Sequence, residues 1–344
     1  MAYLYGIGAF SHSWADEAAS AQRAHRRIGI RAAAYCLPGP AIDVLEWAPA
    51  QNVAPGLIER LLANGCRYFH DGTGMSDADL VANAIDRLRS QCAFDAREVA
   101  YLIHAHTQPF SVPAAPDSVL SCIVGRFSYR PKLSFSVEHL ACASVVHAVE
   151  WGARLLETDR QARYALIVTA DRVFGAATQR IRQDATIQSD GGSAVLLARE
   201  DVRCWLGSTV TVGFTDLHEG PSTPENVARV ARYTWMQTTK LLRKLGDGGL
   251  ALSEYGVFLP INADRRYWRL IARALELPEE RFYLDNIRNR GHACCADFAV
   301  NLADEGFARL EAGEVVAYCG QSNIGAHGVI SLFPVQAQRA GGAP

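Results

Sequence analysis

The chain has 344 residues, of which 49% are hydrophobic and 20% charged, and this predicts a globular protein with about two domains or one duplicated unit. The formal net charge is −2 and the 34 Lys and Arg residues are dispersed, so nothing indicates nucleic-acid binding. No apolar run approaches the roughly 20 residues that span a bilayer and the N-terminal segment lacks a secretory pattern, so we expect a cytoplasmic protein without membrane spans.

Apolar strands and amphipathic helices alternate twice along the chain. In the first part we predict strands over residues 4–10, 99–106, 133–137, 164–169 and 194–198, and helices over 77–90 and after Cys142. In the second part we predict strands over 209–214, 257–261, 315–319 and 329–333, and helices over 224–245, 265–275 and 293–310. Residues 32–72, which are rich in Pro and Gly, are predicted to form loops at a substrate or partner surface. The alternation predicts an α/β fold with mostly parallel sheets.

Cys142 is the candidate nucleophile. The apolar run 133–137 is predicted to be a buried strand, and helical spacing resumes at Val145, so Cys142 lies at the start of a helix. The positive end of that helix dipole favours a thiolate, and the small Ala141 and Ala143 leave room for a substrate carbonyl. The alternative is that Cys142 is a small core residue. The nine cysteines are odd in number and widely spread, which favours reduced thiols.

Four further segments follow in a distinctive order. They read Arg-Tyr-Ala-Leu-Ile-Val-Thr-Ala-Asp-Arg from residue 163, Ser-Asp-Gly-Gly-Ser-Ala-Val-Leu-Leu-Ala from 189, Leu-Pro-Ile-Asn-Ala-Asp from 259, and Arg-Gly-His-Ala-Cys-Cys-Ala-Asp from 290. With the Cys142 segment, they resemble the ketosynthase III branch of the thiolase superfamily. The resemblance implies a homodimer and a five-layered αβαβα thiolase fold with two pseudo-repeated halves. The halves would be residues 1–203, with the nucleophile, and 204–344, with His292 and Asp297.

Two positions depart from the family pattern. A decarboxylating ketosynthase III uses a cysteine, a histidine and an asparagine, and the last two bind the thioester carbonyl as it becomes an enolate. Here the histidine position reads Ile261 and the asparagine position reads His292. Isoleucine offers no donor to an oxyanion, and the loss of one such donor costs roughly 3 to 4 kcal/mol of transition-state stabilisation. We therefore expect decarboxylative condensation to be impaired.

Asp297 lies five residues after His292 and completes a nucleophile, a base and an orienting carboxylate with Cys142. This set resembles the acyltransferase variants of the family, which act in natural-product pathways such as polyketide biosynthesis. It predicts transfer of an acyl group, through an acyl-enzyme on Cys142, to a hydroxyl or amine acceptor. The alternatives are a ketosynthase III-type condensing enzyme and a catalytically silent partner subunit. His292 could also merely fill the asparagine space, and Asp297 could be a helix N-terminal carboxylate.

Other residues are predicted to surround the reacting groups. The backbone NH groups of Cys142, Gln321 and Ser322 are predicted to form the oxyanion hole, with an ordinary turn as the alternative for the loop. The predicted substrate pocket is lined by Ile261, Asn262, His106 and Asn323.

No metal and no permanently bound cofactor are expected; the acyl thioester is a substrate. His104 and His106 could share a strand face and bind a metal, but we favour the interpretation that they line a substrate tunnel toward Cys142 or bond to buried carbonyl groups. Cys294 and Cys295 lack a second ligand pair, which favours packing over zinc binding. Residues 68–77 lack the arginines with which relatives grip coenzyme A, so an acyl carrier protein is favoured over coenzyme A as the donor.

Overall fold

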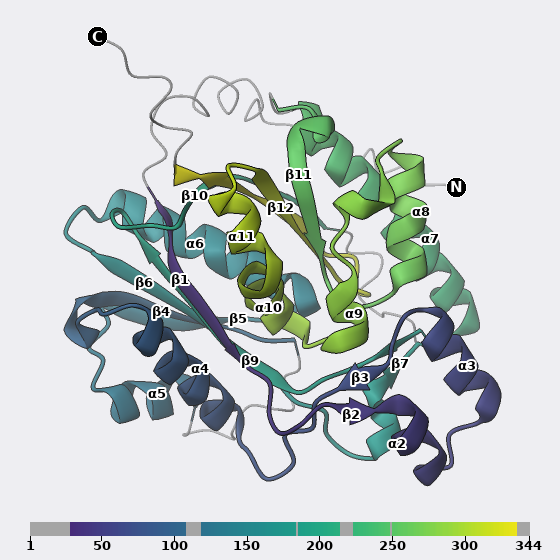
Figure 1. The fold of residues 1–344 in the computed structure, drawn as a ribbon. Helices are drawn as coiled ribbons and strands as arrows, with labels where there is room; N and C mark the ends of the chain where they lie inside the picture. The colour runs from purple at the N-terminus through teal and green to yellow at the C-terminus, as the bar shows by residue number, and fades with distance from the viewer. Residues whose placement is uncertain (1–27, 108–117, 184, 214–222, 248–249, 336–344) are drawn as a thin grey trace, which may run out of the picture.

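The computed structural model describes residues 28–107, 118–183, 185–213, 223–247 and 250–335. Within these residues the centre is a nine-stranded sheet with the order β11-β12-β13-β10-β1-β9-β6-β4-β5 (Figure 1). Its strands are β1 (Gly29–Cys36), β4 (Val99–Ala105), β5 (Leu133–Val137), β6 (Tyr164–Asp171), β9 (Gly191–Ala198), β10 (Cys204–Val212), β11 (Tyr255–Pro260), β12 (Val315–Gln321) and β13 (His327–Pro334). Two small sheets pair β2 (Ile42–Asp43) with β3 (Tyr68–Phe69) and β7 (Ile181–Arg182) with β8 (Thr186–Ile187).

The large sheet consists of two groups of strands with the same internal arrangement. β4 is parallel to β6, which is antiparallel to β9, which is antiparallel to β1. In the same way, β11 is parallel to β12, which is antiparallel to β13, which is antiparallel to β10. The groups join at β1 and β10 through two register pairs, Gly29↔Trp205 and Ile30↔Cys204. The predicted repeat is therefore visible in the strand topology, while the division at residues 203 and 204 stays a prediction.

Helices form three layers around the two groups of strands (Figure 1). α4 (Asp77–Gln91) packs on β1, β9 and β6, and α5 (Val119–Phe127) packs on α4. α6 (Ser144–Thr158) contacts β6 and β13, so it lies between the groups, as do α10 (Asp297–Asn301) and α11 (Phe307–Glu311). α7 (Pro224–Asp247) covers β10 and β13 from the other side, with α8 (Arg265–Ala274) beside it. This is the αβαβα order.

The sheet is mixed, so the prediction of mostly parallel strands was wrong. Three of its eight strand pairs are parallel, namely β4 with β5, β4 with β6, and β11 with β12. The physical reason is the connections: β12 and β13 are joined by residues 322–326, and a loop this short can link only antiparallel neighbours. Parallel pairs occur where a helix crosses over, as α6 does between β5 and β6.

The strand over 133–137 forms as predicted but is not buried. β5 is the edge strand of the sheet and pairs with β4. Leu133, Ser134 and Ser136 are exposed, whereas Phe135 and Val137 are half-buried. The alternation of serine with apolar residues is the pattern of a strand with one solvated face.

Residues 32–72 are not the loop region that the sequence predicted. They complete β1, in the middle of the sheet, and form α2 (Val44–Ala50), α3 (Pro55–Ala63) and β3. Pro55 occupies the first turn of α3, where its missing NH has no helical partner to lose, so this proline marks a helix start. The prediction failed because prolines within or at the start of helices, such as Pro49 in α2 and Pro55 in α3, were interpreted as turn signals.

The helix predicted over 293–310 is divided into four segments. A 3-10 turn (Cys294–Ala296) precedes α10, and a π-helical turn (Leu302–Gly306) separates α10 from α11. The other predicted elements are found with shifts of a few residues, and the strand predicted over 4–10 lies outside the described residues. Within the described ranges, every helix is too short or too polar to cross a bilayer.

Gly192 lets α4 approach β9 closely. A Cβ added to Gly192 would lie 2.8 Å from the carbonyl carbon of Leu80 and 2.9 Å from its Cβ. Leu80 is fully buried in α4 and belongs to the core between that helix and the sheet. A side chain at this position would therefore push the helix off the strand.

We expect Gly192→Ala to lower the free energy of unfolding by about 1 to 3 kcal/mol, because backbone atoms would have to move. The matched control is Gly56→Ala in α3, where the glycine is exposed and an added Cβ meets no atom within 4 Å. The control should be neutral or stabilising by up to about 1 kcal/mol. Urea unfolding of both variants measures the difference, and equal effects would contradict this account of the packing.

Candidate active site

Two turns that begin helices of the inner layer meet at the centre of the molecule. Cys142 lies in a 3-10 turn (Ala141–Ala143, the Cys142 turn) directly before α6, and the Cys294 turn (Cys294–Ala296) directly precedes α10. The two turns pack against each other. Ala141 has φ +48° and Cys294 has φ +53°. For residues with a side chain this left-handed conformation costs roughly 1 to 2 kcal/mol, so the surrounding packing must hold both turns in place.

Cys142, His292 and Asp297 form a continuous chain of contacts. Cys142 Sγ lies 3.1 Å from His292 Nε2, and His292 Nδ1 lies 2.6 Å from Asp297 Oδ2. All three side chains are buried, and Cys142, at 9% exposure, is the most accessible of them. A thiol, an imidazole and a carboxylate in this order have the geometry of a nucleophile, its base and the group that orients the base.

Asp297 is held by four hydrogen bonds. Besides His292, it accepts from the backbone NH groups of Ala293 and Asn262, at 2.8 and 2.7 Å, and from Asn262 Nδ2 at 3.2 Å. The carboxylate therefore serves the free NH groups of a helix start and the imidazole at the same time. Asn262, predicted as a pocket residue, is almost fully buried against Asp297 and fixes its position.

The electrostatics favour a thiolate–imidazolium pair. The hydrogen bond from the Cys294 thiol, and next the charge and hydrogen bond of His292, outweigh burial and hold the pKa of Cys142 well below its usual range. Burial alone would lower the pKa of His292, but the negative charges of Asp297 and Cys142 raise it well above its usual value. The proton shared between the two sulfurs stays on Cys294, whose pKa rises because it donates to Cys142 and is buried.

The segment around Ser189 and Asp190 positions the backbone of His292. His292 N donates to the carbonyl of Ile187 at 3.0 Å, and Ser189 N donates to the carbonyl of His292 at 2.9 Å. Asp190 in turn accepts two hydrogen bonds from the buried guanidinium of Arg180, at 3.0 and 2.9 Å. A motif that the sequence analysis used only to identify a family is thus part of the site.

Sequence reasoning missed two groups at the site, Cys294 and Asp171. Asp171, the last residue of β6, is fully buried and accepts from Thr107 N at 2.7 Å and from Cys295 N at 3.3 Å. Burial and then the charge of Cys142 raise the pKa of Asp171 to about 8. The available signal was an acidic residue at the end of an apolar strand, and for Cys294 it was a second thiol two residues after His292.

Two of the residues predicted to line the substrate pocket, Ile261 and His106, are buried. Ile261 is buried between β11 and Asn262. His106 is buried, lies 3.1 Å from a carboxylate oxygen of Glu138, and stacks on His104.

The loop after β12 was predicted to supply oxyanion-hole amides. Ser322 Oγ accepts from Ala326 N at 2.9 Å and closes a turn, while Asn323 is exposed. Gln321 ends β12, a strand that packs against the Cys142 turn. This location is compatible with an amide of the loop facing the sulfur, which stays a prediction.

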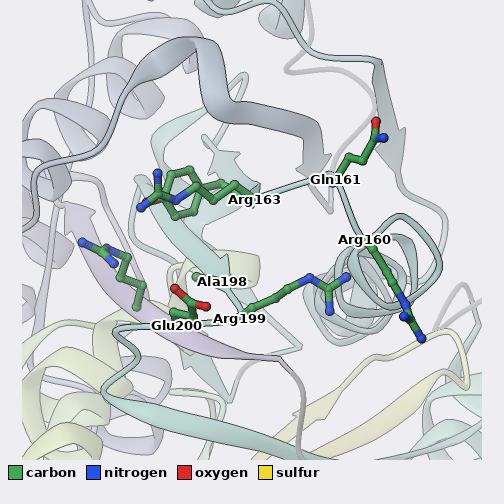
Figure 2. A pocket seen from close by; sticks show the side chains of 9 residues that line it. Arg160, Gln161, Arg163, Ala198, Arg199 and Glu200 are labelled. Carbon is green, nitrogen blue, oxygen red and sulfur yellow. The ribbon is translucent and has the colours of Figure 1, made fainter.

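A separate cavity of about 270 Å³ lies at the other end of β6 (Figure 2). Its lining includes Arg31, Arg160, Arg163, Tyr164 and Arg199. β6 starts at Tyr164 in this cavity and ends at the buried carboxylate beside the Cys142 turn, about 23 Å away at about 3.3 Å per residue. The arginine-lined cavity therefore cannot hold a thioester that reacts with the sulfur.

Comparison with known proteins agrees with the geometry. The family model described as 3-oxoacyl-[acyl-carrier-protein] synthase III matches residues 138–212, which include the Cys142 turn. A relative from Geobacillus kaustophilus, named beta-ketoacyl-[acyl-carrier-protein] synthase III, is 22% identical over 290 residues, which are 80% of this chain and 90% of the relative. The chain is thus similar in sequence to ketosynthase III proteins over most of its length.

Two solved structures, an acyltransferase and a ketosynthase III, have the same fold as this chain. ChlB3, described as an acyltransferase, superposes with a TM-score of 0.76 at 18% identity, over 89% of this chain and 97% of ChlB3. A 3-oxoacyl-[acyl-carrier-protein] synthase III from Aquifex aeolicus gives a TM-score of 0.74 at 14% identity, over 89% and 99% of the two chains. The predicted thiolase fold is confirmed.

The thiolate–imidazolium pair predicts alkylation of Cys142 by iodoacetamide at about pH 6, where an ordinary thiol with a pKa of about 8.5 is almost fully protonated. Because the lowered pKa depends on His292, His292→Asn should slow the reaction at about pH 6 by roughly tenfold or more and recover as the pH rises. Peptide mapping measures the rate, with the exposed Cys122 as the internal reference. An unchanged rate at Cys142 in the variant would disprove the pair.

Proposed function

We propose that this ketosynthase III-like protein is an acyltransferase, which loads an acyl group onto Cys142 and passes it to a hydroxyl or amine. The observation that carries the proposal is the contact chain from Cys142 through His292 to Asp297. It is supported by Ile261, which stands where the family's condensing enzymes have a histidine.

His292 gives up a proton in the first half of the cycle and takes one from the acceptor in the second half. The Cys142 thiolate attacks the thioester carbonyl, the carbon–sulfur bond to the donor breaks, and the departing sulfur takes the proton from His292 Nε2. His292 is then neutral and removes the proton from the acceptor as its oxygen or nitrogen attacks the acyl carbon. Cys142 leaves as a thiolate, which restores the original ion pair. Asp297 keeps the ring oriented through Nδ1 in both halves.

Decarboxylative condensation makes a different demand on the site. It needs donors aimed at the carbonyl oxygen of the second thioester as it becomes an enolate, and the hydrocarbon side chain of Ile261 supplies none. His292 is engaged at Nδ1 by Asp297 and at Nε2 by Cys142. The names of the curated relatives, such as that from Geobacillus kaustophilus, favour the condensing enzyme as the second candidate function.

The donor is proposed to be an acyl carrier protein rather than coenzyme A, in a pathway of secondary metabolism. The support is the absence of arginines from residues 68–77 and the carrier protein in the names of the family and its relatives. The arginine-lined cavity supports neither donor, because it lies at the end of β6 that is far from Cys142. A homodimer in the cytoplasm remains part of the proposal.

The first test exposes the protein to acetyl and malonyl thioesters on coenzyme A and on carrier protein, with intact mass as the readout. We expect an acyl adduct that is absent from Cys142→Ala, and a malonyl adduct that retains its carboxylate. Release of carbon dioxide with formation of a ketoacyl product would support the condensing enzyme instead. No adduct with any donor would support the silent subunit.

A second test separates transfer from loading. Asp297→Asn keeps a side chain of the same size but lets His292 adopt the wrong tautomer, so discharge of the acyl-enzyme to an amine or alcohol should slow by roughly 10²- to 10⁴-fold. The acylated protein is mixed with an excess of acceptor and followed by quenched-flow mass measurement. Asp264→Asn, a change at the N-cap of α8, is the matched control and should discharge at the normal rate. Equal rates in wild type and Asp297→Asn would argue against His292 as the base.

A further inference from the structure

Three ligand atoms of the kind that bind soft metal ions converge beside the nucleophile. Cys142 Sγ, His292 Nε2 and Cys294 Sγ all lie within 4.8 Å of one another. They are the one group of at least three such residues among the described parts of the chain. The sequence did not predict this set, because Cys142 is far along the chain from His292 and Cys294 and meets them only in the fold.

Two sulfurs and one imidazole nitrogen are a ligand set that suits zinc. Zinc binds cysteine sulfur at about 2.3 Å and histidine nitrogen at about 2.0 to 2.1 Å, so tetrahedral ligands lie about 3.5 to 3.8 Å from one another. The sulfur of Cys142 and Nε2 of His292 are 3.1 Å apart. With all three ligand atoms within 4.8 Å of one another, side-chain adjustments of about 1 Å would seat the ion.

The surroundings already supply the outer ligands of such a site. A histidine that binds a metal usually donates its other ring NH to a carboxylate, which fixes the ring and its tautomer. Asp297 accepts from His292 Nδ1 at 2.6 Å and is itself fixed by Asn262 and Ala293. The ring therefore presents Nε2 to the two sulfurs without rearrangement.

The three residues would fill three of the four positions around a tetrahedral zinc ion and leave the fourth to a ligand other than these side chains. Cys142 retains 9% exposure, and Thr107 Oγ1 lies 3.7 Å from its sulfur. Three protein ligands with one open position form the arrangement of zinc sites that exchange a water or another small ligand. When a metal binds, the protons on Cys294 Sγ and His292 Nε2 would leave to solvent.

We propose that Cys142, His292 and Cys294 form a binding site for zinc, and that zinc and an acyl group exclude each other because both need the sulfur of Cys142. The metal is a reversible inhibitor of the thiol, not a participant in acyl transfer. The metal site rests on the geometry of the three ligands alone, whereas its competition with an acyl group rests on the proposed function.

The test uses the full chain, freed of metal and titrated with Zn²⁺ against a chromophoric chelator. We expect one ion per chain, and with Co²⁺ as a probe we expect thiolate-to-metal charge-transfer absorption. Cys294→Ser replaces a soft ligand by a hard one of similar size and should weaken binding by roughly tenfold or more. Cys122→Ser, which removes an exposed thiol remote from the set, is the control and should bind normally.

A second readout does not depend on enzymatic turnover. Zinc should protect Cys142 from iodoacetamide, and a chelator should restore the reaction. Thermal unfolding of Cys294→Ser without metal checks that the variant is folded. Binding of Zn²⁺ that is equally tight in Cys294→Ser, or binding without protection of Cys142, would overturn the proposal, as would the lack of binding by the wild type. The acyl-adduct test on metal-free protein is separate, so either proposal can fail while the other stands.

Discussion

The candidate site depends on one buried carboxylate. Asp297 is fully buried, and an isolated charge there would be very costly without partners. Four hydrogen-bond donors stabilise the charge of Asp297. They are the backbone NH of Ala293, the backbone NH and side-chain Nδ2 of Asn262 in the loop after β11, and Nδ1 of His292. The same four bonds fix the loop that follows β11, start α10 and orient the imidazole. The relative positions of Cys142 and His292 therefore depend on how the second group of strands packs against the inner helices.

The repeated topology explains why a site forms at the centre at all. Each group of strands leads into a turn that starts an inner-layer helix, and the two turns pack against each other. Each turn holds one residue with a positive φ, Ala141 in one and Cys294 in the other. Backbone strain thus occurs at equivalent places in the two halves, where it directs side chains toward the shared centre. The half with β6 contributes the thiolate, and the half with β12 contributes the base.

The sequence predicted the contact of Cys142, His292 and Asp297 because each lies in a short motif at an element boundary, and the order of such motifs is a strong signal. It did not predict Cys294 as a neighbour of Cys142, because nothing local to Cys294 reveals which distant turn it faces. β1 was missed because its alanines lack the β-branched and aromatic residues typical of a central strand. β5 was assigned to the interior because its apolar residues were counted without their alternation. The local sequence pattern determines whether a segment forms a helix or a strand, whereas the elements packed around it determine how deeply it is buried.

The π-helical turn over Leu302–Gly306 has a consequence for how such chains diverge. A π turn holds one residue more than the regular helix needs, so the two ends of the α10–α11 segment are offset by about 100° of rotation relative to an uninterrupted α-helix. Asn301, directly before the π turn, and Asp304, within it, both accept from Asn286 Nδ2. Losing one residue here would leave a regular helix but turn Phe307 and Leu310 away from their places in the core. A one-residue gap in an alignment of this helix would therefore mark a change in which side chains face the core, even though the secondary structure on both sides of the gap looks unchanged.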